Sequence, residues 1–289
     1  MLRNLKIKLL MTLDHFFYAR KLFNPPPKLT IKNNSDISLH GVGNYKPVII
    51  HFPGKYFSWI RKNIDLVDSN YRFNIKPNSS IHILQINNYS NTDKYENPGE
   101  YFLNKNQVPY STLGKNISRD KWKNSIKIEL LYNLLREIKI TDPRKKYFLF
   151  FDSADAILLQ SPEILIQSLL EYKCEILFGM DKAMYNGSSF YNNLFSLPGY
   201  MAKYYYDNYR FLNSGLVFGK IDTMLTVLND IITDFKHIKP NLRKKSDQYY
   251  FHEIRFKYYE TIGIDYKRKY FLNVLPHKSP FEHYQCQVS

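Results

Sequence analysis

Residues 147–155 read YFLFFDSAD, a run of apolar and aromatic residues followed by two carboxylates three positions apart. The run predicts a strand buried on both faces of an α/β sheet, because such strands carry apolar side chains toward both covering layers. It ends at Asp152 and Asp155. Charge at the end of a buried strand is costly unless it meets solvent, a partner or a cation, and ligand sites in open α/β sheets lie at these ends. The stretch therefore predicts both the fold class and the place of a site.

Other short apolar runs predict further strands at residues 46–50, 80–87, 175–178 and 216–218. Between them, residues 121–138 carry apolar side chains at the spacing of an amphipathic helix. Strands that alternate with helices are typical of an α/β layered domain with a mostly parallel central sheet. We therefore expect an N-terminal extension over residues 1–45 and a single domain over residues 46–289, with its core at residues 80–275.

The composition is that of a globular protein with an excess of basic residues. Hydrophobic residues make up 44% of the 289 positions, and the formal net charge is +15. Such a charge suits nucleic acid, an anionic membrane surface or an anionic small substrate. The densest basic runs, at residues 144–146, 243–245 and 267–269, are short and far apart, and no nucleic-acid-binding motif accompanies them. We therefore disfavour nucleic acid as a partner.

Cysteine content and the N-terminal residues bear on the compartment. Cys174 and Cys286 are too few for a disulfide framework and suggest a reducing compartment. Lys6 and Lys8 interrupt the apolar segment that a signal peptide would need, and no apolar run approaches the ~20 residues that cross a bilayer. The sequence predicts a cytoplasmic protein, and contact of a basic amphipathic helix with a membrane surface stays open as an addition.

The carboxylates of Asp152 and Asp155 are candidate metal ligands. Hard divalent cations such as Mn²⁺ or Mg²⁺ prefer oxygen ligands and would bridge the two side chains to a diphosphate. The same spacing also suits a plain turn at the end of a strand, with one aspartate as a helix cap. Taken alone, this pair leaves both interpretations open.

Downstream segments favour the metal interpretation. YRFLNSG (residues 209–215), SDQ (246–248) and IDYK (264–267), which leads into YFLN (270–273), follow the carboxylate pair in this order. Together with DSAD they resemble the glycosyltransferase domain of procollagen lysyl hydroxylases and collagen glycosyltransferases. The resemblance covers about residues 80–275 and includes Thr112-Leu113-Gly114 and the helix of Lys127.

The resemblance implies a GT-A fold: a nucleotide-binding α/β sandwich that uses a UDP-sugar donor, with Mn²⁺ (or Mg²⁺) held by Asp152 and Asp155. It implies a hexosyltransferase that moves the sugar to a hydroxyl acceptor on a protein side chain or a glycan. Loss of the donor sugar leaves new negative charge on the nucleoside diphosphate, which a divalent cation neutralises as a Lewis acid.

The resemblance also suggests roles for individual residues. Asn213 would bond donor-sugar hydroxyls, with Ser214 and Gly215 giving a close backbone approach, although Asn213 also suits a turn cap. Asp247 would contact the sugar or act as a base on the acceptor, although it also suits a helix N-cap, and Asp181 is the other candidate base. The remaining substrate-binding candidates are Gln248, Lys127 and Trp122, the last of which suits either a stacking surface or the core.

Two features of the sequence depart from the family pattern. Ala154 stands where an aromatic residue is usual, so one nucleotide contact is missing or supplied elsewhere. The acidic run that normally precedes Asp-Gln is reduced to Ser246-Asp247 after a lysine pair. Acceptor recognition, and with it a connection to collagen, need not follow the family.

The third metal ligand is the boldest expectation. The family supplies a histidine from a His-x-Asn-Gly-x-x-Lys segment about forty residues after the asparagine of YFLN, whereas only sixteen residues follow Asn273 here. Residues 47–55, PVIIHFPGK, look similar to that missing segment. We therefore expect a circularly permuted arrangement in which His51 binds the metal and Gly54 and Lys55 meet the diphosphate. His277 is the alternative ligand, and a site in which both histidines are solvated stays open.

Two other functions stay open at this point. One is a sugar- or nucleotide-binding protein that kept the fold and lost activity. The other is a basic scaffold on a membrane surface, whose lipid binding would survive alanine at both Asp152 and Asp155.

Overall fold

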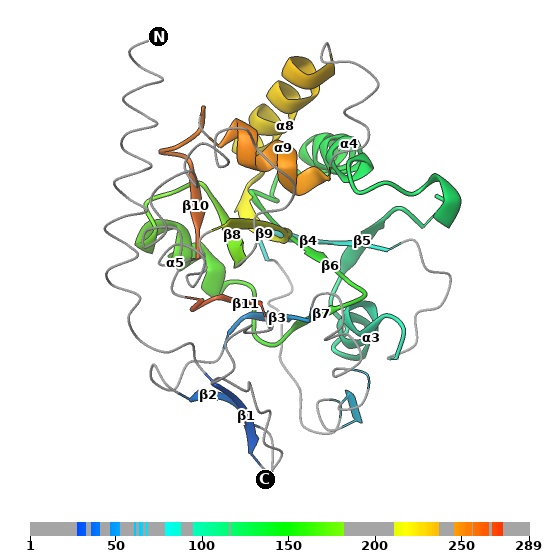
Figure 1. Cartoon of the computed structure of the whole chain (residues 1–289), viewed down its shortest axis with the longest axis vertical. Coiled ribbons are helices and arrows are strands. Elements are labelled where there is room, and N and C mark those ends of the chain that lie inside the picture. Colours follow the sequence, from blue (N-terminus) through cyan, green and yellow to red (C-terminus); the bar gives the residue numbers. More distant parts are fainter. Residues whose placement is uncertain are drawn as a thin grey trace, which may run out of the picture.

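The computed structural model describes residues 28–32, 36–40, 47–52, 61, 64, 65, 68, 79–87, 95–115, 117–181, 211–236, 246–255, 257–265 and 268–273. These residues form three β-sheets and the helices that pack against them (Figure 1). Among the described helices, none combines the length and the apolar character that crossing a membrane requires.

The largest sheet has the strand order β10-β8-β9-β6-β4-β5. Its strands are β4 (Ile81–Ile86), β5 (Tyr110–Leu113), β6 (Tyr147–Asp152), β8 (Ile176–Asp181), β9 (Phe211–Lys220) and β10 (Ile262–Ile264). Strands β5, β4 and β6 run parallel, as do β8 and β10, whereas β9 is antiparallel to both of its neighbours. The predicted α/β fold with a mostly parallel central sheet is confirmed, and the apolar run that precedes Asp152 is the buried strand β6.

Strand β9 is longer than its apolar run at residues 216–218 predicted. Its first half carries the buried polar residues Asn213 and Ser214, which interrupt the apolar pattern. The ladder with β8 is also irregular there: Phe178 pairs with Val217, and the next residue, Gly179, pairs with Asn213. The residues between Asn213 and Val217 therefore bulge out of the β8–β9 ladder.

Helices cover both faces of the central sheet (Figure 1). On one face lie α4 (Ile126–Thr141), α8 (Ile221–Lys236) and α9 (Asp247–Ile254), whose core cluster includes Phe150, Phe178, Leu131, Met224 and Phe251. On the other face lie α3 (Pro98–Lys105) and α5 (Ile164–Glu171), whose cluster includes Phe151, Phe218, Leu103, Leu165 and Phe271. Helix α4 begins later than predicted because a short 3₁₀ helix (η2, Arg119–Lys121) and a turn precede it.

A second sheet, in the order β11-β3-β7, packs beneath the first one (Figure 1). Strand β3 (Ile49–His51) is parallel to β11 (Phe271–Asn273) and antiparallel to β7 (Ala156–Leu158). Because β7 follows β6 after three residues, the turn at residues 153–155 connects the two sheets. Strands β1 (Lys28–Lys32) and β2 (Asp36–His40) form a separate antiparallel ribbon within the predicted N-terminal extension, whose boundary at residue 45 stays a prediction.

Candidate active site

The predicted site residues gather at one edge of the central sheet. The parallel strands β4, β6 and β8 all end there, at Ile86, Asp152 and Asp181. Antiparallel β9 begins at the same edge, which brings Asn213 beside Asp181. The topology therefore collects polar residues from distant parts of the sequence, as expected for the carboxyl ends of an open α/β sheet.

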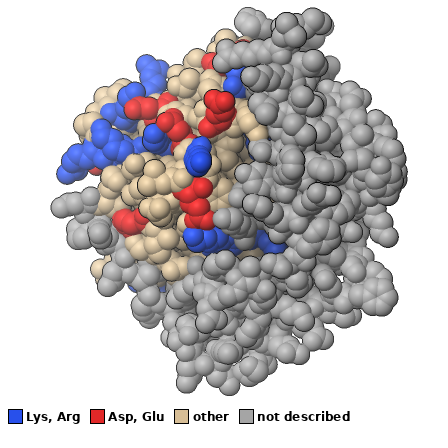
Figure 2. Space-filling model, turned by 90° about the vertical axis from the view of Figure 1, so that its left-hand side faces the viewer, with Lys and Arg blue, Asp and Glu red and all other residues tan. Residues whose placement is uncertain are grey.

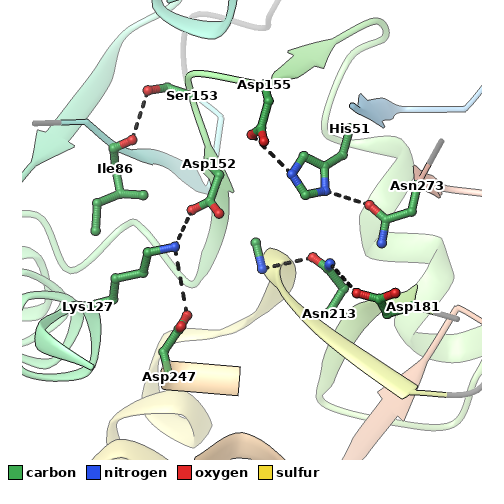
Figure 3. A network of polar contacts seen from close by, with 11 residues as sticks. His51, Ile86, Lys127, Asp152, Ser153, Asp155, Asp181, Asn213, Asp247 and Asn273 are labelled. Atoms are coloured by element: carbon green, nitrogen blue, oxygen red, sulfur yellow. Dashed lines mark hydrogen bonds and ion pairs between the residues drawn. The ribbon is translucent and has the colours of Figure 1, made fainter. Parts of the chain in front are cut away.

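Backbone contacts hold the turn between β6 and β7. Ser153 is fully buried, and its hydroxyl donates to the carbonyl of Ile86, at 2.9 Å (Figure 3). On the other side, the amide of Gly99 in α3 donates to the carbonyl of Ser153, at 2.9 Å. The turn that carries the two aspartates is thus fixed to β4 and to α3.

The structure places His51 against this turn. His51 ends β3, where it pairs in register with Ala156 of β7 and with Asn273 of β11. Its Nε2 lies 3.1 Å from Oδ1 of Asp155, and one ligand atom each from His51, Asp152 and Asp155 lie within 4.8 Å of one another (Figure 3). An imidazole nitrogen and two carboxylate oxygens at this spacing fit a divalent cation. The metal role of the three residues belongs to the proposal below.

Electrostatics around His51 favour a positive charge at this point. Burial favours the neutral ring, but the carboxylates of Asp155 and Asp152 outweigh burial and raise the pKa of His51 to about 9. The proximity of two carboxylates to a buried ring is the physical cause of this shift.

Lys127 joins two carboxylates that the sequence assigned to different roles. This lysine lies in the first turn of α4, and its Nζ is 2.7 Å from Oδ1 of Asp152 and 3.9 Å from Oδ2 of Asp247 (Figure 3). Burial alone would lower the pKa of Lys127, but Asp152 and Asp247 raise it. The ammonium therefore stays charged and links Asp152, at the end of β6, to Asp247 of α9.

Asp247 is the first residue of α9, and Ser246 occupies the N-cap position. Its side chain is buried and bonds with the Ser214 hydroxyl, which ties α9 to β9. Burial raises the pKa of Asp247, while Lys127 acts in the opposite direction. Because Ser246 occupies the N-cap position, the alternative in which Asp247 serves as the helix N-cap is wrong.

Asn213 makes both a local and a longer-range contact. Its Oδ1 accepts from the amide of Gly215, at 2.9 Å, and its Nδ2 donates to Oδ2 of Asp181, at 3.3 Å (Figure 3). A Cβ on Gly215 would lie 2.8 Å from Oδ2 of Asp152, so the glycine allows the strand to approach that carboxylate. The turn-cap and site interpretations of Asn213 are both consistent with these contacts.

The other substrate-binding candidates are less closely joined to the aspartates. Gln248 follows Asp247 in α9 and is buried. Trp122 is partly buried against the core, and its ring lies so close to Gly114 that a Cβ there would be 2.6 Å from it. Gly54, Lys55 and His277 lie outside the described residues, so their predicted roles stay predictions.

Three contacts in the site escaped sequence reasoning. Asn273 bonds His51, Ser153 bonds β4, and Gly99 approaches the turn from α3. The YFLN motif pointed to Asn273 without giving it a role. Ser153 and Gly99 are small residues without a distinctive pattern, and only the fold shows what they touch.

Comparison with known families agrees with the sequence resemblance. A search of curated proteins gives no match to the chain. The family model described as "PLOD GT domain" matches residues 89–282, about two thirds of the chain. This range contains Asp152, Asp155, Asn213 and Asp247, whereas His51 precedes it. The resemblance drawn from DSAD, YRFLNSG, SDQ and YFLN is confirmed, the α/β sheet is consistent with a GT-A-like fold, and the chain belongs to the PLOD glycosyltransferase-domain family.

Proposed function

We propose that the chain is a metal-dependent glycosyltransferase that moves a hexose from a UDP-sugar donor to a hydroxyl acceptor. Membership of the family supports glycosyl transfer. The observation that carries the finer proposal is the meeting of His51, Asp152 and Asp155, whose ligand atoms lie within 4.8 Å of one another. The three residues come from β3, from β6 and from the turn that follows β6. They meet at the edge of the sheet where open α/β folds bind ligands, which supports a functional centre.

The donor set favours Mn²⁺ over Mg²⁺ because imidazole is a better ligand for transition metals, whereas Mg²⁺ prefers oxygen. When bound, the cation would supply Lewis-acid neutralisation of the leaving diphosphate. Lys127 contacts Oδ1 of Asp152, so the lysine would hold the side chain of this proposed ligand in place. The lysine thereby orients one metal ligand.

Asn213 and Asp247 are the proposed catalytic residues. Asn213 is oriented by Asp181 and Gly215, so its amide can bond donor-sugar hydroxyls from a fixed position. Asp247, whose pKa is raised by burial, would bond the sugar or accept the acceptor proton, and Asp181 is the other candidate base. Ser214, Gly215, Gln248, Trp122, Gly54 and Lys55 complete the proposed substrate-binding set.

We also propose the circularly permuted origin of the third ligand. Strand β3 pairs in parallel with β11, so His51 lies directly beside Asn273 of the YFLN motif. The likeness of residues 47–55 to the family's His-x-Asn-Gly-x-x-Lys segment, together with this pairing, supports permutation.

A donor screen with and without Mn²⁺ tests the proposal on the wild-type chain and on Asp152→Ala. We expect Mn²⁺-dependent turnover of one UDP-sugar in the wild type and a loss of about 100-fold or more in the variant, since the cation supplies several kcal/mol of transition-state stabilisation. Asp222→Ala is the matched control, because this aspartate is 74% exposed on α8 and pairs only with surface Lys139 among the described residues. Equal turnover in wild type and Asp152→Ala would refute the metal assignment.

The same screen separates the two other functions. Binding of a UDP-sugar without turnover would identify a protein that kept the fold and lost activity. A membrane scaffold would bind anionic vesicles even after alanine replaces both Asp152 and Asp155. On the face shown in Figure 2, the described Lys and Arg side chains lie beside Asp and Glu side chains.

A further inference from the structure

Asn273 is a buried amide that joins the proposed metal ligand His51 to the central sheet. It is the last residue of β11, and only 2% of its surface is exposed. Its Oδ1 lies 2.6 Å from Nδ1 of His51, and its Nδ2 donates to the carbonyl oxygen of Met180 in β8, at 2.7 Å (Figure 3). Both polar atoms of this side chain therefore have defined partners.

These two contacts determine which ring nitrogen of His51 carries a proton. A backbone carbonyl can only accept, so the atom of Asn273 that faces Met180 must be the amide nitrogen. The atom that faces His51 is then the amide oxygen, which can only accept as well. Nδ1 of His51 must therefore donate, whatever the state of Nε2.

The backbone around Asn273 is also fixed. The buried carboxylate of Asp265 accepts the amides of Lys269, Tyr270 and Phe271, which determines where β11 begins. Strand β11 then pairs in parallel register with β3, so that Asn273 lies opposite His51. The amide is held at its position by the strand as well as by its side-chain bonds.

On the basis of the proposed function, we propose that Asn273 is a positioning residue that fixes the Nδ1–H form and the ring plane of His51. With Nδ1 occupied, only Nε2 can offer a lone pair to a cation, and Nε2 is the atom that faces Asp155. Hydrogen bonds of this kind to metal-binding histidines orient the ring and raise its basicity. Asn273 would thus act on the metal through His51 without touching it.

A merely structural amide would behave differently. If Asn273 only satisfied polar groups in the core, its replacement would lower the free energy of unfolding but leave the Mn²⁺ affinity of the folded protein unchanged. Metal affinity of the folded chain therefore separates the two roles.

The test is a Mn²⁺ titration by calorimetry on the full chain carrying Asn273→Leu or Asn273→Asp. We expect Asn273→Leu to bind Mn²⁺ about 10- to 100-fold more weakly than the wild type. Asn273→Asp keeps an acceptor for Nδ1–H and should retain most of the affinity. Gln85→Leu is the control, because Gln85 is also buried and its side-chain amide donates to Thr112 rather than to any of the three proposed ligands. Equal Mn²⁺ affinity of wild type and Asn273→Leu would overturn the proposal, as would an Asn273→Asp protein that folds but has lost Mn²⁺ binding.

A second measurement separates this proposal from the proposed function. Nitrogen-15 NMR of the metal-free wild type should show an exchange-protected proton on Nδ1 of His51, and Asn273→Leu should lose that protection. If the wild type shows this proton but binds no Mn²⁺, the metal-dependent function fails while the orientation of His51 by Asn273 stands. If Nδ1 carries no proton, the proposal about Asn273 fails whether or not Mn²⁺ binds.

Discussion

Gly99 lies where the first turn of α3 meets the backbone of the turn that carries Asp152 and Asp155. A Cβ at this position would be 2.7 Å from the carbonyl oxygen of Ser153 and 2.8 Å from that of Ala156. Both atoms belong to the backbone, so no side chain can move aside to relieve the overlap. We therefore expect Gly99→Ala to displace the turn itself.

The size of the effect follows from these distances. Overpacking of this kind costs about 1–3 kcal/mol in the free energy of unfolding. Ligand atoms must be held within about 0.5 Å of their productive positions, which is comparable to the shift that the new methyl group demands. We expect Gly99→Ala to bind Mn²⁺ at least about 10-fold more weakly, because Asp155 belongs to the displaced turn and Asp152 directly precedes it.

Urea unfolding and Mn²⁺ calorimetry on the same samples provide the assay, with Gly219→Ala as the control. A Cβ on Gly219 would lie 2.9 Å from the carbonyl oxygen of Glu175, a similar backbone overlap at the opposite end of β9 from Asn213. The control should lose comparable stability and keep its Mn²⁺ affinity. If Gly99→Ala also kept wild-type affinity, α3 would not position the turn and the reasoning would be refuted.

Three further predictions concern the aspartates and the pH dependence of folding. Gly215→Ala should reduce both Mn²⁺ affinity and turnover, since its Cβ would lie 2.8 Å from Oδ2 of Asp152; unchanged binding in calorimetry would contradict this. Lys127→Met should lower the free energy of unfolding by about 1–3 kcal/mol in urea titrations, because the Asp152 and Asp247 carboxylates lose the ammonium that they share. An unchanged free energy of unfolding would count against that link. Burial, together with the charge of Lys145, lowers the pKa of His82 to about 4. Below pH ~6.5 the unfolded chain therefore binds more protons than the folded chain. The free energy of unfolding should fall as the pH drops toward 4. His82→Gln should flatten this fall in unfolding experiments at several pH values, and an identical slope would show that His82 does not cause it.

The sequence predicted the central parts of the fold because buried strands have a strong local pattern. The apolar run before Asp152 has few alternatives to a buried strand, and the structure confirms it as β6. The extent of β9 was missed, because Asn213 and Ser214 are polar and break the apolar pattern on which strand prediction depends. Likewise, the antiparallel direction of β9 depends on pairing with β6 and β8, which no local pattern encodes.

The site was predicted unevenly for a similar reason. Asp152 and Asp155 stand three residues apart, so their proximity follows from the sequence. His51 was found only through the likeness of its segment to a family motif, and the structure places it 3.1 Å from Asp155. The contact of Asn273 with His51 spans 222 positions and depends on the pairing of β11 with β3, which the sequence does not specify.

The most direct test of the account is a crystal of the full chain grown with Mn²⁺ and UDP, measured for anomalous scattering at the manganese edge. We predict a single strong peak bonded to Nε2 of His51 and to carboxylate oxygens of Asp152 and Asp155. No peak at this position, or a peak bonded to the aspartates with His51 turned away, would contradict it.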